Sequence, residues 1–279
     1  MLIVDIINLK DIKVLLKGGG DLASGIGYRL NRAGFNLLIV EKPEPTAIRR
    51  TVSFASAIYQ GQLEVEGVRG TKVKNIEEAE ECWSEGSVPV ITTNQKDLLS
   101  RFKPDIIIDG RMLKERTDQT IDEARLVIGI GPGFTINQNC HLAVETNRGH
   151  HLGRVIYEGS TAKNTGSPGN VNGYTDERVI HAPEAGTFQS DCQIGQKVNT
   201  GEVIGKVKNI ILKTKISGVI RGLLKPGIEV KAGTKLADVD PRSEENYCYY
   251  ISDKALAIAG GVLEAIFYWY NSDNMKGVS

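Results

Sequence analysis

The residues with the clearest chemical potential form a glycine-rich loop near the start of the sequence. An apolar run over residues 12–17 is followed by Gly-Gly-Gly-Asp-Leu-Ala-Ser at residues 18–24, and then by sequence compatible with a helix. This loop fits the G-x-G-x-x-A fingerprint, in which glycines allow a tight turn and close approach of the backbone to a phosphate. Glu41 follows about twenty residues later, where an acid accepts hydrogen bonds from ribose hydroxyls. The residues predicted to contact a nucleotide here are Gly18, Gly19, Gly20, Asp21, Ser24 and Glu41.

The same loop leaves other interpretations open. A glycine-rich turn in an α/β domain whose ligand binds elsewhere would have the same sequence, and so would a loop that holds another anion. The loop lacks the Gly-Lys-[Ser/Thr] ending of a P-loop, which argues against ATP hydrolysis of that type. Glu41 opposes a 2′-phosphate, which predicts an unphosphorylated ribose. Arg49 and Arg50 come next, and either contact a charged ligand or lie on the solvated face of a helix.

Further polar residues follow other apolar runs, and the carboxyl ends of parallel strands share one ligand-binding edge. Asp109 and Arg111 follow one such run, and Gly131 and Gly133 follow the next. Arg111 can clamp a phosphate or carboxylate, and the two glycines can present backbone amides to an anion. Equally, Asp109 and Arg111 can pair with each other, and Gly-Pro-Gly can be only a tight turn.

A third group of polar residues follows the run at residues 142–145. His150 is a candidate proton carrier, Arg148 a candidate substrate clamp, and Glu145 stands beside them as a third candidate catalytic residue. Loop polarity alone could also explain this cluster. The cysteine and histidines within residues 140–151 match no defined metal-site spacing, so no metal is predicted.

Short apolar runs alternate with longer mixed segments from residue 12 to about residue 157, as expected when crossover helices join parallel strands. Several runs are rich in Ile, Val and Leu without alternation, as strands covered on both faces are. We therefore predict a doubly wound, Rossmann-like parallel sheet. The predicted strands are residues 12–17, 36–41, 88–93, 105–109, 126–130 and 142–145.

The sequence changes character after residue 160. Residues 160–173 are poor in apolar side chains and dense in turn formers, which predicts a linker. Near the end, apolar residues recur at helical spacing over residues 251–270, and the Gly260-Gly261 pair inside this helix indicates close approach of another backbone. The predicted divisions are a nucleotide-binding domain (1–160), a linker (161–177), a small β domain (178–242) and a C-terminal helical segment that packs back on the first domain (243–279).

The predicted β domain contains an internal repeat with an offset of 32 residues. Two such halves resemble the interlocked halves of biotinyl and lipoyl carrier domains, the barrel-sandwich hybrid. The lysines at the junction of the halves have no flanking Met and no preceding Asp, so a binding or docking module is expected rather than a carrier. The coincident pairs are Gly186 and Gly218, Gly195 and Gly227, Val198 and Val230, Gly201 and Gly233, Ile204 and Leu236, and Val207 and Val239.

Composition excludes several classes of function. The 279 residues contain 34 Lys and Arg against 34 Asp and Glu, so no overall field would attract nucleic acid or an anionic membrane. The four cysteines are far apart, which favours a reducing compartment. The start of the sequence lacks a basic region and carries Asp5, unlike a signal peptide. We expect a cytoplasmic protein, and the base rate favours a homodimer.

Motifs spread over nearly the whole sequence resemble those of the YqeB family. That resemblance implies an accessory or cofactor-maturation role for selenium-dependent molybdenum hydroxylases, and the glycine-rich part is distantly similar to xanthine dehydrogenase accessory proteins. If the role includes selenium transfer, Cys140 is the one candidate carrier that the resemblance suggests. The motifs are residues 17–25 (Lys-Gly-Gly-Gly-Asp-Leu-Ala-Ser-Gly), 47–54 (Ala-Ile-Arg-Arg-Thr-Val-Ser-Phe), 109–112 (Asp-Gly-Arg-Met), 129–134 (Gly-Ile-Gly-Pro-Gly-Phe), 145–150 (Glu-Thr-Asn-Arg-Gly-His), 164–169 (Asn-Thr-Gly-Ser-Pro-Gly), 217–222 (Ser-Gly-Val-Ile-Arg-Gly) and 238–242 (Asp-Val-Asp-Pro-Arg).

Three functions are therefore compatible with the sequence. The first is an accessory protein that binds NAD or the dinucleotide form of the molybdenum cofactor above the glycine-rich loop, with a molybdenum hydroxylase as its partner. The second is an NAD-dependent oxidoreductase acting on a small substrate. The third is a non-catalytic scaffold that docks a hydroxylase.

Overall fold

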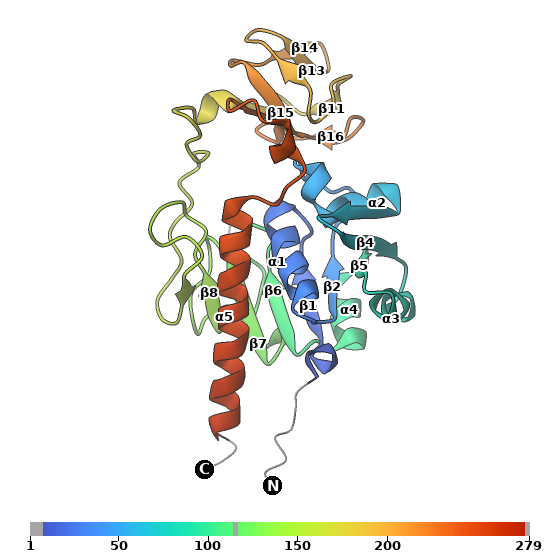
Figure 1. Ribbon diagram of the computed structural model, residues 1–279, viewed down its shortest axis with the longest axis vertical. Coiled ribbons are helices and arrows are strands. Elements are labelled where there is room, and N and C mark those ends of the chain that lie inside the picture. Colours follow the sequence, from blue (N-terminus) through green and yellow to red (C-terminus); the bar gives the residue numbers. More distant parts are fainter. Residues whose placement is uncertain (1–7, 114–116, 277–279) are drawn as a thin grey trace.

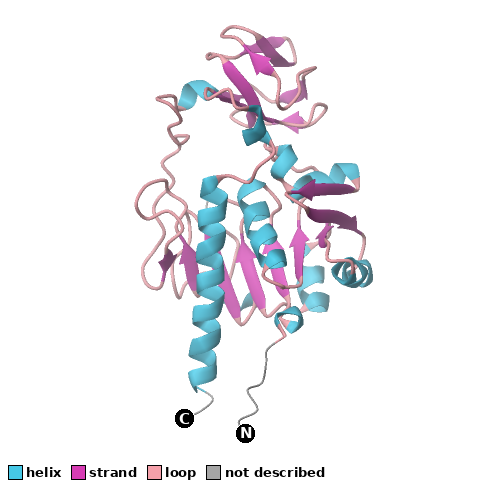
Figure 2. Ribbon diagram, in the orientation of Figure 1, coloured by secondary structure: helices cyan, strands magenta, loops and turns pink. Residues whose placement is uncertain are grey.

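The structure is a computed structural model that describes residues 8–113 and 117–276 (Figure 1). Asp5, which entered the signal-peptide argument, lies outside the described residues. Two lobes are visible, a larger α/β lobe that includes both described ends of the chain and a smaller β lobe beyond it (Figure 2). No helix of residues 8–113 and 117–276 combines the length and the apolar character needed to cross a bilayer.

The α/β lobe is built on one sheet, in which nine strands of the described residues follow the order β3-β4-β5-β2-β1-β6-β7-β8-β9. The seven strands from β4 to β8 in this order are parallel, and β3 and β9 are antiparallel edge strands. The strands are β1 (Val14–Lys17), β2 (Leu37–Val40), β3 (Gln62–Val65), β4 (Val68–Val73), β5 (Val88–Ile91), β6 (Ile106–Asp109), β7 (Leu126–Ile130), β8 (Leu142–Val144) and β9 (Val155–Ile156).

Helices cover both faces of this sheet because successive strand residues point to opposite sides. In β1, Val14 and Leu16 join the apolar core beneath α1 and α5, whereas Leu15 joins a second core with α3 and α4 on the other face. The helices are α1 (Asp21–Arg32), α2 (Ala57–Gln60), α3 (Ile76–Ser84), α4 (Gln95–Phe102) and α5 (Asp253–Lys276), with 3₁₀ turns at Leu9–Asp11, Arg50–Val52, Phe54–Ser56, Ile121–Glu123, Asp176–Arg178 and Glu245–Cys248.

The predicted class is confirmed at the level of a mixed α/β protein with a large, mostly parallel sheet and a C-terminal helix. Each of the six predicted apolar runs contains a strand of this sheet. The sequence analysis missed the β3-β4 hairpin and the edge strand β9. The hairpin turns at Glu66 and Gly67, both with positive φ, as a two-residue type I′ turn requires. Its strands are half-exposed, so they lack the continuous apolar run by which buried strands are recognised.

The C-terminal helix α5 lies alongside α1, and both lie on the same face of the sheet (Figure 1). The two helices approach closely because Gly25 of α1 has no side chain; a Cβ there would lie 2.8 Å from the Cβ of Ala255. Gly261 is equally constrained, since a Cβ would overlap the carbonyl oxygen of Gly153. Gly260 has open space around it. The predicted close approach of another backbone therefore holds for Gly261 alone.

The β lobe consists of two four-stranded sheets in the described residues, ordered β10-β17-β15-β12 and β14-β13-β11-β16. The repeat is visible in the strands, because β11, β12 and β13 begin at residues 186, 197 and 203 and their counterparts β15, β16 and β17 at 218, 229 and 235. Strands of one half pair with strands of the other half, since β12 pairs with β15 and β11 pairs with β16. The strands are β10 (Val179–His181), β11 (Gly186–Gln189), β12 (Lys197–Val198), β13 (Val203–Val207), β14 (Ile210–Lys213), β15 (Gly218–Leu223), β16 (Glu229–Val230) and β17 (Lys235–Asp240).

A short segment of the α/β lobe docks into the β lobe. Ile48 is buried in the apolar core of the β lobe, where its side chain occupies the space that Gly222 leaves open. The backbone of Ile48 accepts a hydrogen bond from Leu223 at 2.8 Å, and Arg50 Nε donates to the Leu223 carbonyl at 2.7 Å. These contacts join the two lobes at one point beside the carboxyl ends of the large sheet.

We predict opposite effects for two adjacent glycines of α5. Gly261→Ala should lower the free energy of unfolding by about 1–3 kcal/mol, because the new methyl group would overlap the Gly153 backbone. Gly260→Ala should raise it by up to about 1 kcal/mol, because the space is open and Ala has the higher helix propensity. Urea unfolding followed by circular dichroism measures both, and equal effects would contradict the close contact.

Candidate functional site

A large crevice lies at the carboxyl ends of β1, β2, β5 and β6, where strand connections leave the sheet in opposite directions on either side of β1. Its volume is about 1040 Å³. Parallel α/β sheets bind ligands at this position. The crevice is lined by Lys17, Gly18, Gly20, Asp21, Leu22, Ala23, Val40, Glu41, Lys42, Pro43, Thr46, Ala47, Thr92, Thr93, Asn94, Gln95, Gly110, Arg111, Met112, Leu113 and Lys235.

Each glycine of the predicted loop meets a different requirement. Gly18 has φ of +91°, a conformation that L side chains rarely adopt. Gly19 packs on the backbone of Ala55, which donates a hydrogen bond to the Gly19 carbonyl at 2.8 Å. Gly20 caps the N-terminus of α1 in extended backbone, and a Cβ added there would meet open space. Of the three, only Gly20 can therefore receive a side chain without strain or overlap.

Glu41, at the end of β2, is held against the glycine-rich loop. One carboxylate oxygen accepts a hydrogen bond from the Gly19 amide at 2.8 Å, and the other accepts one from the Lys42 amide at 2.8 Å. Ser24 lies beneath the loop and lines none of the cavities described here. Its fully buried hydroxyl donates to the Gly19 carbonyl and accepts from the Phe54 amide, so it stabilises the loop from inside.

Arg111 lines the crevice but is engaged within the chain. Its guanidinium donates to both carboxylate oxygens of Asp109, at 3.0 and 2.7 Å, and to Asp118 at 2.5 Å. Burial acts to lower the pKa of Arg111, but its hydrogen bonds and charge attraction to the two carboxylates raise this pKa above its usual value. The alternative in which Asp109 and Arg111 pair with each other is the arrangement found.

A second cavity, which we call the interlobe chamber, opens from the crevice and lies between the two lobes. Its volume is about 570 Å³, and its walls come from the α/β lobe, the linker, the β lobe and the start of α5. Asp21, Leu22, Thr46, Ala47, Met112 and Lys235 line both cavities. Seven basic residues but three acidic ones line the chamber: Arg49, Arg148, Lys163, Arg178, Arg221, Lys235 and Lys254 against Asp21, Glu145 and Asp238.

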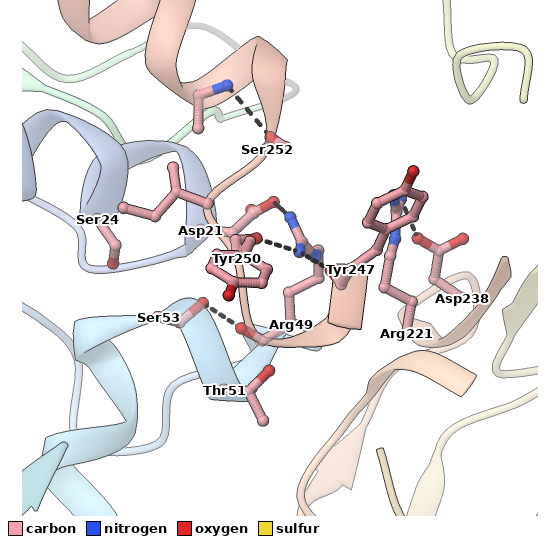
Figure 3. A network of polar contacts seen from close by, with 12 residues as sticks. Asp21, Ser24, Arg49, Thr51, Ser53, Arg221, Asp238, Tyr247, Tyr250 and Ser252 are labelled. Carbon is pink, nitrogen blue, oxygen red and sulfur yellow. Dashed lines mark hydrogen bonds and ion pairs between the residues drawn. The ribbon is translucent and has the colours of Figure 1, made fainter. Parts of the chain in front are cut away.

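Arg49 lines this chamber and contacts two other parts of the chain, the start of α1 and the segment before α5 (Figure 3). Its guanidinium donates to the carbonyls of Tyr247 and Tyr250, at 2.9 and 3.0 Å, and lies 3.7 Å from the Asp21 carboxylate. Arg50 lines no cavity described here, and its bond to Leu223 is a lobe contact. Neither arginine lies on a solvated helix face.

The β lobe supplies a buried charge cluster that the sequence analysis did not identify as a site. Asp238 accepts from Arg178 at 2.5 Å and from Arg221 at 2.8 Å. Arg178 and Arg49 are 5% and 6% exposed, and burial lowers the pKa of both guanidinium groups. A signal was present, because Arg221 and Asp238 interrupt the apolar strands β15 and β17.

Two partly exposed lysines, Lys235 and Lys254, complete the basic lining of the chamber. No hydrogen bond or ion pair from Lys235 or Lys254 occurs within the part of the chain that the structure describes. Burial is the largest influence and lowers the pKa of each amine. The nearby carboxylates of Asp238 and Asp21 act to raise the pKa of Lys235, whereas Arg148 lowers that of Lys254 further and the carboxylate of Asp21 acts against it.

The three predicted catalytic residues border a third cavity of about 670 Å³, which we call the histidine pocket. The Glu145 carboxylate is saturated, because it accepts from the backbone amides of Thr146, Asn147 and Ala162. Arg148 forms a two-point ion pair with Asp253, at 3.1 Å for each hydrogen bond. His150 is exposed at the histidine pocket and does not line the crevice.

Gly131 and Gly133 form a tight turn and line none of the three cavities. Both have positive φ, +80° and +96°, and the Gly131 amide donates to the Val144 carbonyl. Cys140 is fully buried, and burial raises the pKa of its thiol to about 12. A selenium carrier needs an accessible thiolate, which this environment opposes. Within the described residues, no three His, Cys, Asp or Glu side chains gather closely enough to hold a metal ion.

The fold and cavities define a two-lobed α/β protein with a glycine-lined crevice beside a chamber lined mainly by basic side chains. No protein-family model matches the sequence. It is similar to the Escherichia coli (strain K12) protein named "Uncharacterized protein YqeB", at 43% identity over 253 residues, 91% of this chain and 47% of that protein. The chain thus spans about half the length of this relative. The similarity supports the resemblance to the YqeB family.

Similarities to solved structures are weak. A succinylglutamate desuccinylase/aspartoacylase from Rhodobacter sphaeroides is 27% identical over 23% of this chain and 21% of its own, with a TM-score of 0.20. The ectoine utilization protein EutE (DoeB) from Ruegeria pomeroyi, in its apo form, is 10% identical over 82% of this chain and 85% of its own, with a TM-score of 0.25. At these scores neither structure defines the fold of this chain.

We predict that Glu145 is structural. Glu145→Gln should lower the free energy of unfolding by about 1–3 kcal/mol, because an amide group cannot accept all three backbone hydrogen bonds. Urea denaturation measures this loss. Glu158→Gln, an exposed position on the same histidine pocket, is the control and should change stability by less than about 0.5 kcal/mol. Equal stability of the two variants would contradict the structural role.

Proposed function

We propose that this protein binds a nucleotide-bearing ligand in the crevice and serves as an accessory protein rather than as a catalyst in its own right. The observation that carries the proposal is the open space at Gly20, at the start of α1, facing a crevice of about 1040 Å³. Ligand cavities typically have volumes of about 300–1000 Å³. The amides in the first turn of α1 have no acceptor within the helix, so they suit a diphosphate.

The strand order supports a Rossmann-like interpretation of the α/β lobe. The central strands β5-β2-β1-β6-β7-β8 run as 3-2-1-4-5-6 when numbered in chain order without the edge hairpin and β9, the order of dinucleotide-binding sheets. Glu41 at the end of β2 suits a ribose, and its present bond to the Gly19 amide holds the carboxylate at the loop. NAD and a molybdopterin dinucleotide both fit this arrangement of ribose and diphosphate.

The β lobe supports a second element of the proposal. Its exchanged strands suit a barrel-sandwich hybrid, with the predicted domain divisions at residues 160, 177 and 242. Arg178, Arg221, Lys235 and Asp238 of this lobe line the interlobe chamber, so the lobe acts as a wall or lid over the ligand. Its remaining surface is free to dock a partner.

The partner we propose is a selenium-dependent molybdenum hydroxylase, on the strength of the YqeB similarity. The oxidoreductase alternative receives less support from the geometry. Glu145 and Arg148 are engaged within the chain, and His150 does not line the crevice. A scaffold role would use the exposed aromatic side chains of Tyr249 and Tyr250, and would leave partner binding unaffected by changes in the crevice.

Denaturing mass spectrometry of small molecules released from the purified protein tests the proposal directly, beside a thermal-shift panel of NAD, NADP, ATP, CTP and FAD. A released pterin or cytidine dinucleotide, or a thermal shift with one nucleotide of the panel, is the expected result. Gly20→Val should abolish the shift with little loss of stability, because its side chain projects into open crevice space.

Gly260→Ala is the control, since it is also an open position but lies within α5. It should leave the thermal shift unchanged. No released ligand together with no shift across the panel would refute the proposed function, as would a Gly20→Val variant that binds nucleotide with unchanged affinity.

A further inference from the structure

More basic than acidic side chains line the interlobe chamber. Its three acidic residues are all engaged within the chain. Asp238 accepts from Arg178 and Arg221, Glu145 accepts from three backbone amides, and Asp21 lies 3.7 Å from Arg49. Arg148 and Arg221 also pair with Asp253 and Asp240, which do not line the chamber, so the excess positive charge comes from other basic residues, Lys235 and Lys254 among them.

The donors that remain without partners are concentrated here. The Nε atoms of Arg49, Arg178 and Arg221 are buried and make no hydrogen bond, and all three residues line the chamber. Arg49 and Arg178 are more than nine-tenths buried. Lys235 and Lys254 add two amines without a carboxylate partner in the described chain. Buried donors without acceptors, and buried charges without counter-charges, destabilise a folded protein.

An anion within the chamber would remove this cost. Guanidinium groups match the oxygens of phosphates and carboxylates, and lysines add point charges to such sites. Arg148 pairs with Asp253 and Arg221 also pairs with Asp240, so the positive charge left for an anion is chiefly that of Lys235 and Lys254, and two charges exceed what one carboxylate would balance. A volume of about 570 Å³ accommodates a diphosphate with part of the molecule that carries it.

We propose that the interlobe chamber is a polyanion site that binds a diphosphate group, held by Lys235 and Lys254 above the guanidinium groups of Arg178 and Arg221. The diphosphate belongs either to a molecule that extends from the crevice or to a separate molecule, because the two cavities share an opening lined by Asp21, Thr46 and Met112. The proposal depends on charge in the chamber alone. It holds whether or not a nucleotide occupies the crevice.

Calorimetric titration with sodium pyrophosphate at low ionic strength tests the site. The full chain should bind one pyrophosphate, and the Lys235→Met, Lys254→Met double variant should bind it at least tenfold more weakly, since two charge-assisted contacts are lost. The melting temperature of this variant without pyrophosphate should not fall, because it loses two charged groups whose burial the nearby carboxylates offset only in part. A merely structural role for the lysines predicts the opposite change in stability.

A matched control removes two exposed lysines of the β lobe, Lys197 and Lys231, which line none of the three cavities. Their double replacement by Met should leave the affinity for pyrophosphate unchanged. Lys254→Arg, which retains the charge, should bind pyrophosphate within a few-fold of the unaltered chain. The proposal is overturned if the unaltered chain does not bind pyrophosphate, if the chamber variant keeps its affinity, or if the control pair loses as much.

The proposed nucleotide site in the crevice and the proposed diphosphate site in the chamber can be refuted independently. Gly20→Val should still bind pyrophosphate. The thermal-shift panel, applied to the Lys235→Met, Lys254→Met double variant, still tests whether a nucleotide binds in the crevice. Competition distinguishes the source of the diphosphate: displacement of pyrophosphate by NAD supports one molecule that spans both cavities, whereas simultaneous binding supports a separate phosphate compound. Either result supports the chamber site.

Discussion

The docking of Ile48 into the β lobe is the contact on which the arrangement of both cavities depends. Its side chain completes the apolar core of a lobe that begins more than a hundred residues later, in the space left by Gly222. The hydrogen bonds of Ile48 and Arg50 to Leu223 then fix the direction of approach. Apolar burial and these two hydrogen bonds hold the carboxyl end of the sheet beside the β lobe, and the chamber lies between them.

Burial beside the chamber changes the pKa and the hydrogen bonding of charged side chains that would be fully hydrated on an open surface. Arg49 and Arg178 lose water without gaining full hydrogen bonding, so burial lowers the pKa of both groups. The same applies to Lys235 and Lys254, which are brought into one space from the β lobe and from α5. Burial of the guanidinium groups strengthens their attraction to an anion, because water screens buried charges less than exposed ones.

The sequence predicts the crevice but does not predict the chamber. The spacing of Gly18, Gly20 and Glu41 predicts a ligand site, because a tight turn and an acid after the next strand are short-range features. All three residues line the crevice. Glu145, Arg148 and Ser24 have the residue types of a site, yet the fold engages them in capping, pairing and loop support. The type of a side chain does not reveal whether its hydrogen-bonding capacity is already used within the chain.

The sequence by itself determined the apolar runs of the parallel sheet, the repeat in the β lobe and the amphipathic C-terminal helix. Each of these features appears in the sequence as a regular pattern of apolar, polar or glycine residues. Only the tertiary structure decided which charges share a cavity. Arg49, Arg221 and Lys254 lie far apart in sequence, and their convergence depends on lobe docking and on the return of α5 to α1. Periodicity specifies which face of an element is buried, whereas the electrostatics of a site depend on distances across elements that no local pattern records.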